Sequence, residues 1–299
     1  MSSIQNWISA ARPRTLPLAV SGIIMGNFLA FSYKKFDLTI AFISILTAVF
    51  LQILSNLAND YGDTQHGADN ELRSGPSRAV QSGAITASQM KVGMAIAALL
   101  SLTSGLFLIY FSFGLFTANF NIFLTLGLLS IVAAYSYTAG ILPYGYKGLG
   151  DLSVFLFFGP VAVAGSYFLQ THNLDILIFL PALSVGLLSV AVLNLNNMRD
   201  VLPDAAAGKV TIPLKLGLQK AGFYHFGLIL FAFLGAITFH ILIAGLQKWM
   251  LFLVTIIIFG NTLKVVLRQP EPQLLDPLLK KTALGTLAFV LLFGIGIII

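Results

Sequence analysis

The chain has 299 residues, of which 57% are apolar and only 9% are charged, and its mean hydropathy is +0.90. Soluble domains carry about 25% charged residues, so the composition excludes a soluble globular enzyme, and its hydrophobicity excludes a disordered chain. The absence of cysteine excludes disulfides, cysteine nucleophiles and cysteine ligands of zinc. The formal net charge of +6 has the sign of a nucleic-acid-binding protein, but the positions of the basic residues indicate membrane topology instead.

Nine segments are apolar enough to cross a bilayer as helices, each needing about 20 residues. The sequence therefore predicts an all-α, polytopic membrane protein. The uncharged stretch 92–146 is long enough for two crossings, and we expect the break between them near residues 113–121. The predicted spans are 15–33, 38–59, two within 92–146, 152–171, 176–198, 221–247, 249–267 and 282–299.

The basic residues are distributed unevenly between the two sides of these spans. With the N-terminus on the first side, that side receives 14 of the 17 Lys and Arg residues and the other side receives three. The positive-inside rule then makes the N-terminus cytoplasmic. Nine of the 11 acidic residues lie on the same side. We therefore expect a multi-pass protein of the cytoplasmic (inner) membrane, with its active site facing the cytoplasm.

Two loops on that side are unusually polar, and each follows an apolar span. Asn and Asp residues recur in them about every four positions, which places each set on one face of a continuing helix. Adjacent carboxylates repel each other and oppose the helix dipole, so they persist most easily around a cation. Carboxylates together with phosphate groups suit Mg²⁺, and the interleaved bases suit phosphate. The predicted metal–diphosphate site contains Asp60, Asp63, Asp200 and Asp204, with Arg73, Arg78, Lys147, Arg199 and Lys209.

The two polar loops are separated by 140 residues, with four spans to each unit. This spacing indicates a divergent duplication within a single domain, residues 1–299. The two four-helix units would cover about 15–140 and 150–268, and a ninth helix would cover 282–299.

A third loop places Lys147 and Asp151 four residues apart, beside two tyrosines that include Tyr144. Lys147 is a candidate to hold phosphate, and Asp151 is a candidate to orient Lys147 or a metal-bound water. Two further acids, Glu271 and Asp276, fall in a proline-rich loop and are interpreted as ordinary solvated charges.

These motifs resemble those of the UbiA-type intramembrane prenyltransferases. The resemblance rests on Asn59-Asp60-x-x-Asp63, on the Arg-x-Gly-Pro-x-Arg run 73–78 and on Asp200-x-x-x-Asp204. Segments 11–16, 82–83, 147–150, 158–160 and 196–209 are similar to those of members that prenylate 1,4-dihydroxy-2-naphthoate in menaquinone synthesis. One departure is Thr64, which stands where the family's first motif often has its second acid.

The resemblance implies nine helices around a central cavity and transfer of a polyprenyl group from its diphosphate to an aromatic acid, with loss of CO₂. Mg²⁺ is the implied cofactor. The implied partners are polyprenyl diphosphate, the aromatic acid and the lipid bilayer, with no nucleic acid and no obligate protein partner. Asp60, Asp63, Asp200 and Asp204 would bind metal; Asn56, Asn59, Arg73, Arg78, Asn196, Arg199 and Lys209 would serve the diphosphate; Lys147 and Asp151 would assist catalysis; Arg12, Arg14 and Tyr144 would meet the acceptor.

Alternatives remain open on the sequence alone. Within the family, 4-hydroxybenzoate, haem or chlorophyll prenylation would need similar motifs. From another class, a membrane transporter also uses repeats and polar intramembrane residues, although transporters place ionisable groups near the bilayer midplane. Here the middles of the spans contain no Asp, Glu, Lys or Arg. A lipid phosphatase or phosphotransferase is a weaker rival.

Overall fold

The computed structural model describes residues 3–68, 78–141, 143–244, 249–268 and 271–299. Within those ranges the chain is helical, and its one pairing of extended backbone is an isolated bridge between Lys147 and Val210. Eight helices are long and apolar enough to cross a membrane, and a shorter apolar helix over Leu251–Val266 occupies the place of the eighth predicted span. The expected all-α polytopic architecture is therefore confirmed.

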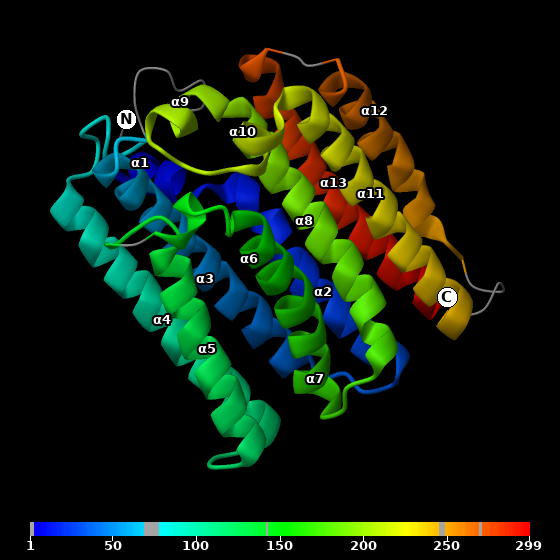
Figure 1. Ribbon diagram of the computed structural model, residues 1–299. Coiled ribbons are helices and arrows are strands. Elements are labelled where there is room, and N and C mark those ends of the chain that lie inside the picture. Colours follow the sequence, from blue (N-terminus) through cyan, green and yellow to red (C-terminus); the bar gives the residue numbers. More distant parts are fainter. Residues whose placement is uncertain (1–2, 69–77, 142, 245–248, 269–270) are drawn as a thin grey trace.

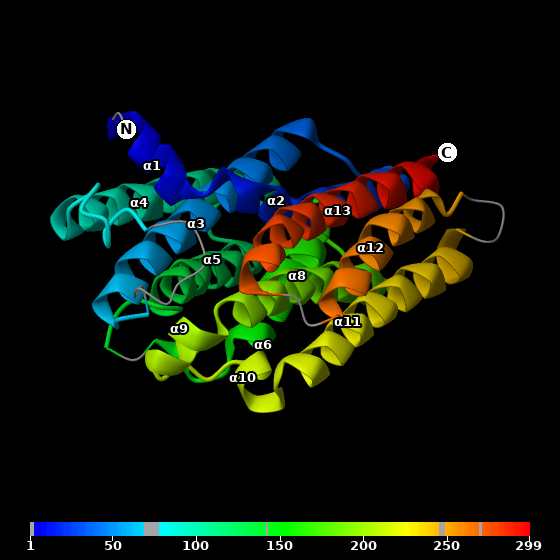
Figure 2. The ribbon, with the colours of Figure 1, turned by 90° about the horizontal axis from the view of Figure 1, so that it is seen from above.

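The long helices pack side by side in one bundle (Figure 1). The short helices α9 and α10 lie at the end where α8 finishes and α13 begins (Figures 1 and 2). The elements are α1 (Ser3–Ala11), η1 (Pro13–Thr15), α2 (Leu16–Ser32), α3 (Leu38–Gln65), α4 (Ala87–Phe113), α5 (Ala118–Ser136), η2 (Tyr144–Tyr146), α6 (Gly150–Leu156), η3 (Phe157–Ala164), α7 (Gly165–Thr171), η4 (Ile176–Ile178), α8 (Phe179–Arg199), α9 (Val201–Ala206), α10 (Ile212–Leu216), α11 (Leu218–Phe239), η5 (His240–Ala244), η6 (Leu251–Thr255), α12 (Ile256–Val266) and α13 (Pro272–Ile298).

Local sequence signals explain where several helices begin. Asp37 caps α3 by accepting hydrogen bonds from two backbone amides of the first turn. Thr86 and Gln89 form a reciprocal capping box at the start of α4, as their spacing predicts. Gly114 ends α4 with a φ of 72°, a conformation that glycine adopts without strain, and Thr117 caps α5. The predicted break near residues 113–121 is thus confirmed.

Among the boundaries that differ from the predicted spans, three affect the polar end. Helix α3 continues through Asp60 and Asp63 to Gln65, because helical geometry does not stop where the apolar stretch stops. Helix α5 ends at Ser136, which leaves residues 137–141 and 143–146 to form a loop and the turn η2. Helix α13 begins at Pro272, ahead of residue 282, and proline is favoured at the start of a helix. Asp276 therefore lies on a helix.

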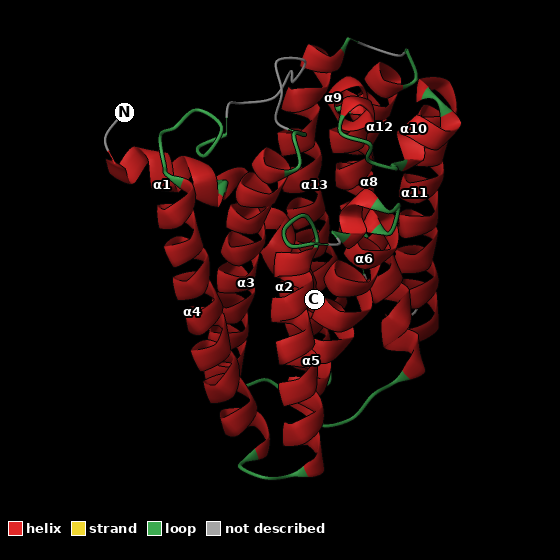
Figure 3. Ribbon diagram, turned by 60° about the vertical axis from the view of Figure 1, so that its left-hand side comes forward, coloured by secondary structure: helices red, strands yellow, loops and turns green. Residues whose placement is uncertain are grey.

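Helix α1 was not predicted, and neither were the short helices α9 and α10. The segment Ser3–Ala11 forms α1, which runs across the end of the bundle at a steep angle to α4 (Figure 3). The chain then turns at Arg12, whose φ of 50° lies in the left-handed region, and enters α2 through η1. This turn sets Arg12 and Arg14 beside the ends of α3 and α13.

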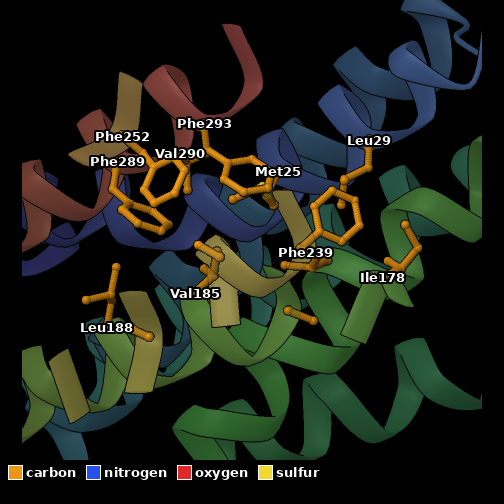
Figure 4. Packing of buried hydrophobic residues seen from close by; sticks show 14 of the residues in the cluster. Met25, Leu29, Ile178, Val185, Leu188, Phe239, Phe252, Phe289, Val290 and Phe293 are labelled. Atoms are coloured by element: carbon orange, nitrogen blue, oxygen red, sulfur yellow. The ribbon is translucent and has the colours of Figure 1, made fainter. Parts of the chain in front are cut away.

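The main apolar core lies between α2, α8, α11 and α13, with α12 and η6 closing one side. In this core, Phe289 of α13 meets Phe233 of α11 and Phe252 of η6 edge to face. Figure 4 shows Phe252, Phe289 and Phe293 grouped together above Val185 and Leu188 of α8. The core fixes α8 and α13 relative to each other, and both carry residues of the polar end.

The outer helices are apolar on the outside as well. Helix α5 exposes Leu129 and Val132, and α4 exposes Leu99 and Phe107. A large exposed apolar surface on a helix long enough to span is typical of contact with lipid.

Candidate functional site

A polar cavity opens at the end of the bundle where α3 and α8 terminate. Its volume is about 190 Å³. Residues far apart in the sequence line it, because η1, α3, the 137–151 loop, α8, α9 and α13 all end or turn here (Figures 1 and 2). The charged and amide side chains in its wall are Arg12, Arg14, Gln52, Asn56, Asn59, Asp63, Arg78, Asp151, Asn196, Asn197, Asp204, Lys209 and Lys280.

Asp63 and Asp204, one from each polar loop, converge on a single ammonium group. Lys209 Nζ lies 2.9 Å from Asp63 Oδ1 and 3.2 Å from an oxygen of Asp204. The same carboxylate of Asp63 accepts hydrogen bonds from Arg78 Nη2 at 3.2 Å and from the Tyr146 hydroxyl at 2.9 Å. The ring of Tyr146 also lies under the Lys209 ammonium, 4.6 Å from it. The structure therefore joins the two loops that the sequence places in one site.

This cluster perturbs the charges within it. The pKa of Asp204 is raised to about 6, chiefly by burial; Lys209 opposes this rise, and the carboxylates Asp200 and Asp63 add to it. Burial alone would lower the pKa of the Lys209 ammonium, but Asp63 and Asp204 outweigh burial and leave that pKa raised. The lysine is therefore protonated, and Asp204 titrates around pH 6.

Asp60 lies on the same helix as Asp63 but faces a different partner. Its side chain is 2% exposed, and its two oxygens accept the backbone amides of Ala79 and Val80, each at 3.0 Å. These bonds fasten the segment that carries Arg78 to the end of α3. The metal role of Asp60 stays a prediction, and in this structure Asp60 anchors a loop.

Asp200 is likewise engaged away from the cavity. Arg199 donates a hydrogen bond to each carboxylate oxygen of Asp200, from Nε at 2.8 Å and from Nη2 at 2.6 Å. Arg199 is buried and also donates to Asn196 Oδ1 at 2.9 Å and to Asp276. Interpreting Asp276 as a solvated loop charge was therefore wrong, because α13 begins early and carries it to Arg199 and Arg14.

The asparagines of the first loop make structural contacts. Asn56 donates to Ala11 O at 2.8 Å and to the Thr15 hydroxyl at 3.0 Å, which ties α3 to the turn that carries Arg12. Asn59 accepts a hydrogen bond from the Thr138 hydroxyl at 2.8 Å. Both asparagines line the cavity. They therefore stabilise its wall and are also within reach of a ligand bound there.

The third loop separates its predicted site residues. Asp151 lines the cavity and accepts a hydrogen bond from the Tyr224 hydroxyl at 3.1 Å. Tyr144 lines a deeper cavity, and its hydroxyl contacts Ala133 O and Ser153. Lys147 is exposed and lies outside the lining of the cavities described here. Arg73, the remaining candidate, falls outside the described residues.

Several residues of the site were not identified from the sequence. Tyr146, Tyr224, Asp276 and Lys280 contact or line it. Tyr224 sits in an apolar span and Asp276 in a proline-rich segment, so no motif marks them. For Tyr146, the position beside the Lys147 loop was the only signal.

Two apolar cavities continue from the polar one into the bundle. The first, about 300 Å³, shares Asn59, Tyr137, Phe158 and other lining residues with the polar cavity. The second, about 480 Å³, lies between α3, α4, α5 and α7 and shares residues such as Leu51 with the first. The two apolar cavities therefore lie in sequence from the charged end toward the membrane-facing helices, and we call them the apolar path.

The donor chemistry of the polar cavity fits a hard divalent cation. Mg²⁺ is usually bound by one or two carboxylates plus substrate phosphates. Asp63 and Asp204 supply two carboxylates that already share one cation, Lys209. Among the described residues no group of three or more acidic, His or Cys side chains forms a self-sufficient metal site. The arrangement therefore fits a metal that is bound together with an anionic substrate.

Comparison with known proteins agrees with this geometry. The model of the UbiA prenyltransferase family matches residues 19–275. The chain belongs to the UbiA prenyltransferase family. The 1,4-dihydroxy-2-naphthoate octaprenyltransferases of Haemophilus influenzae and Escherichia coli are 41% and 43% identical to it, each over 99% of this chain and 96% of the relative.

Solved structures of the family share the fold. A UbiA homologue from Aeropyrum pernix K1 matches with a TM-score of 0.67 and 17% identity, covering 100% of this chain and 98% of the homologue. A homologue from Archaeoglobus fulgidus, bound to GPP and Mg²⁺, matches with a TM-score of 0.63 and 14% identity, over 98% and 99% of the two chains. At this level of identity the similarity establishes the fold.

Proposed function

We propose that this protein is a Mg²⁺-dependent prenyltransferase that joins a polyprenyl group to 1,4-dihydroxy-2-naphthoate with loss of CO₂. One observation carries the proposal. Asp63 and Asp204, which lie far apart in the sequence, both contact the Lys209 ammonium beside the apolar path. Similarity to the naphthoate prenyltransferases of two bacteria supports the choice of acceptor.

The polar cavity suits the diphosphate of the donor. Asp63 and Asp204 would hold Mg²⁺, which neutralises charge on the leaving diphosphate. Arg78 and Lys209 stand beside those carboxylates and can donate to phosphate oxygens. Donors placed where negative charge develops lower the barrier to breaking the allylic C–O bond. The apolar path behind them would take the polyprenyl tail.

The acceptor needs little help from the protein to act as a nucleophile. Two ring hydroxyls raise the electron density at the carbon that bears the carboxylate, so that carbon can attack the allylic cation. The attacked carbon then carries no proton to remove, and loss of CO₂ restores aromaticity. Asp151, which accepts a hydrogen bond from the Tyr224 hydroxyl in the cavity wall, would take a proton from an acceptor hydroxyl during attack and return it to that oxygen once CO₂ has left. Arg12 and Arg14 line the same cavity and suit the carboxylate of the acceptor.

The excess of basic residues at the polar end supports a cytoplasmic active site in the cytoplasmic membrane. In this orientation, water-soluble aromatic acid enters from the cytoplasm and the prenyl tail lies among lipids. Labelling of single cysteines introduced at Lys34 and Lys220 in intact cells tests the orientation. The proposal expects only the position 34 variant to react with an impermeant reagent, and the opposite pattern contradicts it.

The direct test of function supplies purified protein with polyprenyl diphosphate and either 1,4-dihydroxy-2-naphthoate or 4-hydroxybenzoate. We expect a prenylated naphthol, no comparable benzoate product, and no turnover in excess EDTA. A preference for 4-hydroxybenzoate would overturn the acceptor while leaving prenyl transfer intact. Uptake of a solute into vesicles without any prenylated product would favour a transporter.

A further inference from the structure

A chain of ion pairs joins the N-terminal turn, α8 and α13 beside the cavity. Asp276 accepts hydrogen bonds from Arg14 Nη1, at 3.2 and 3.1 Å to its two oxygens, and one from Arg199 Nη1. Arg199 in turn holds both oxygens of Asp200. Arg14 and Arg199 lie 262 and 77 residues from Asp276 in the sequence, and the packing of α13 against η1 and α8 brings them together.

The two ends of this chain differ in their access to the cavity. Arg14 lines the cavity and its side chain is 32% exposed. Arg199 is 1% exposed and contacts the cavity only through Asn196, whose side-chain oxygen it holds at 2.9 Å. Asp276 lies between the two guanidinium groups and outside the cavity lining, although the next turn of its helix supplies Leu279 and Lys280 to that lining.

The shared pairing of Arg199 has a physical consequence. A buried guanidinium must keep a counterion, because an unpaired buried charge is strongly destabilising. If Asp200 were the sole carboxylate that contacts Arg199, its turning toward another cation would leave the buried Arg199 guanidinium without a counterion. With Asp276 on the same guanidinium, Asp200 can leave and Arg199 stays paired.

We propose that Asp276 is a positioning residue that keeps Arg199 paired while Asp200 turns to the metal and that holds Arg14 against the cavity wall. The inference rests on the proposed function, because it assumes that Mg²⁺ and a diphosphate occupy the cavity. Asp276 itself contacts neither. Its effect is to lower the free energy needed to release Asp200 from Arg199.

The test compares purified wild-type protein with Asp276→Asn. The readout is the Mg²⁺ concentration that gives half-maximal thermal stabilisation in the presence of inorganic pyrophosphate, with no turnover required. Removing the carboxylate leaves Asp200 as the only carboxylate on Arg199, so we expect this concentration to rise about tenfold. The Mg²⁺ requirement for prenyl transfer should rise in parallel, with kcat at saturating Mg²⁺ changing less than about threefold.

Two further variants sharpen the test. Asp276→Glu keeps the charge and should stay within about threefold of the wild-type Mg²⁺ midpoint. Glu271→Gln is the matched control, since Glu271 is exposed, stands at the start of the same helix without a side-chain capping hydrogen bond, and lies outside the network. It removes one negative charge near the site and should leave the midpoint unchanged. Asp276→Ser replaces Asp276→Asn if the asparagine variant fails to fold.

The possible results are distinct. A raised midpoint in the Asn or Ser variant, with rescue by Glu and no effect of Glu271→Gln, supports the proposal. A midpoint within about twofold of wild type overturns it, as does an equal shift in Glu271→Gln, which would indicate a general effect of charge. If wild-type protein shows neither stabilisation by Mg²⁺ and pyrophosphate nor prenyl transfer, the proposed function itself fails, and this inference fails with it.

Discussion

Lys209 determines the charge balance between the two aspartate loops. Its ammonium contacts Asp63 and Asp204 and lies over the ring of Tyr146, so one side chain joins three elements of the site. In the proposed substrate complex, Asp63 and Asp204 would hold Mg²⁺, and the Lys209 ammonium would donate to a phosphate oxygen. A lysine at this position thus suits a site that must change partners.

Replacing either carboxylate should remove turnover while the protein still folds. We expect Asp63→Asn and Asp204→Asn each to lower kcat at least about 100-fold, corresponding to ~2.7 kcal/mol of transition-state stabilisation. Both side chains lie at the cavity wall, outside the apolar core. Prenyl transfer by purified variants measures the effect, with Glu271→Gln as the charge control. Near-wild-type rates in both variants would exclude the two-carboxylate metal site.

The raised pKa of Asp204 predicts a pH dependence. Because that pKa is about 6, the carboxyl is protonated at pH 5 and ionised at pH 7.5. A protonated carboxyl is a poor ligand, so the affinity for Mg²⁺ should fall as the pH drops through 6. Titration of Mg²⁺ with pyrophosphate at several pH values checks this, and Asp204→Asn should lose that part of the dependence. A wild-type affinity that is flat between pH 7.5 and 5 would contradict the assignment.

At the scale of elements, the end of α3 fastens the segment that follows it. Asp60 accepts the amides of Ala79 and Val80 while Asp63, one turn later, faces the cavity. A single helix end thus anchors a loop and presents a ligand. The repeated Asn and Asp pattern predicted a shared face, but it could not distinguish these two uses, because both need a carboxylate at the same helix end.

Asp60→Asn tests the anchoring role. The new amide group opposes one of the backbone amides, and a buried amide left unsatisfied costs about 1–3 kcal/mol. We therefore expect a lower unfolding temperature of the metal-free protein, measured by thermal unfolding in detergent. Lost activity with an unchanged unfolding temperature would instead assign Asp60 to the metal.

The contact between α2 and η3 is tight enough to depend on glycine. A Cβ atom at Gly26 would lie 2.0 Å from the Ser166 hydroxyl and 2.3 Å from the carbonyl oxygen of Val163. Gly26→Ala should therefore destabilise the protein by about 1–3 kcal/mol. Gly227→Ala, where a Cβ meets no atom within 4 Å, is the control and should be neutral or slightly stabilising. Equal unfolding temperatures for the two variants would contradict this packing.

At the scale of the whole molecule, hydropathy was sufficient to predict the helical membrane fold. The spans follow from the length of the apolar segments. The proximity of the two polar loops follows from their place at the same end of the bundle. The pairing of Asp276 with Arg14 and Arg199 could not be predicted, because it depends on how α13 packs against η1 and α8. The same holds for Tyr224 and Asp151. The internal duplication stays a prediction.

The bundle combines a charged end with an apolar path, and this division matches a substrate that has a diphosphate head and a lipid tail. The polar cavity adjoins the first apolar cavity, which in turn adjoins the second, as their shared lining residues show. Most Asp, Glu, Lys and Arg residues lie at one end, and the middles of the predicted spans contain none, as expected for chemistry at a membrane surface.

The most direct measurement follows the carboxyl carbon of the acceptor. Purified protein receives polyprenyl diphosphate, Mg²⁺ and 1,4-dihydroxy-2-naphthoate labelled in its carboxyl group, and labelled CO₂ is counted against prenylated product. The account predicts one CO₂ released for each prenyl group transferred, with neither formed in excess EDTA or by Asp63→Asn. A prenylated product that retains the label, or CO₂ released without prenyl transfer, would contradict it.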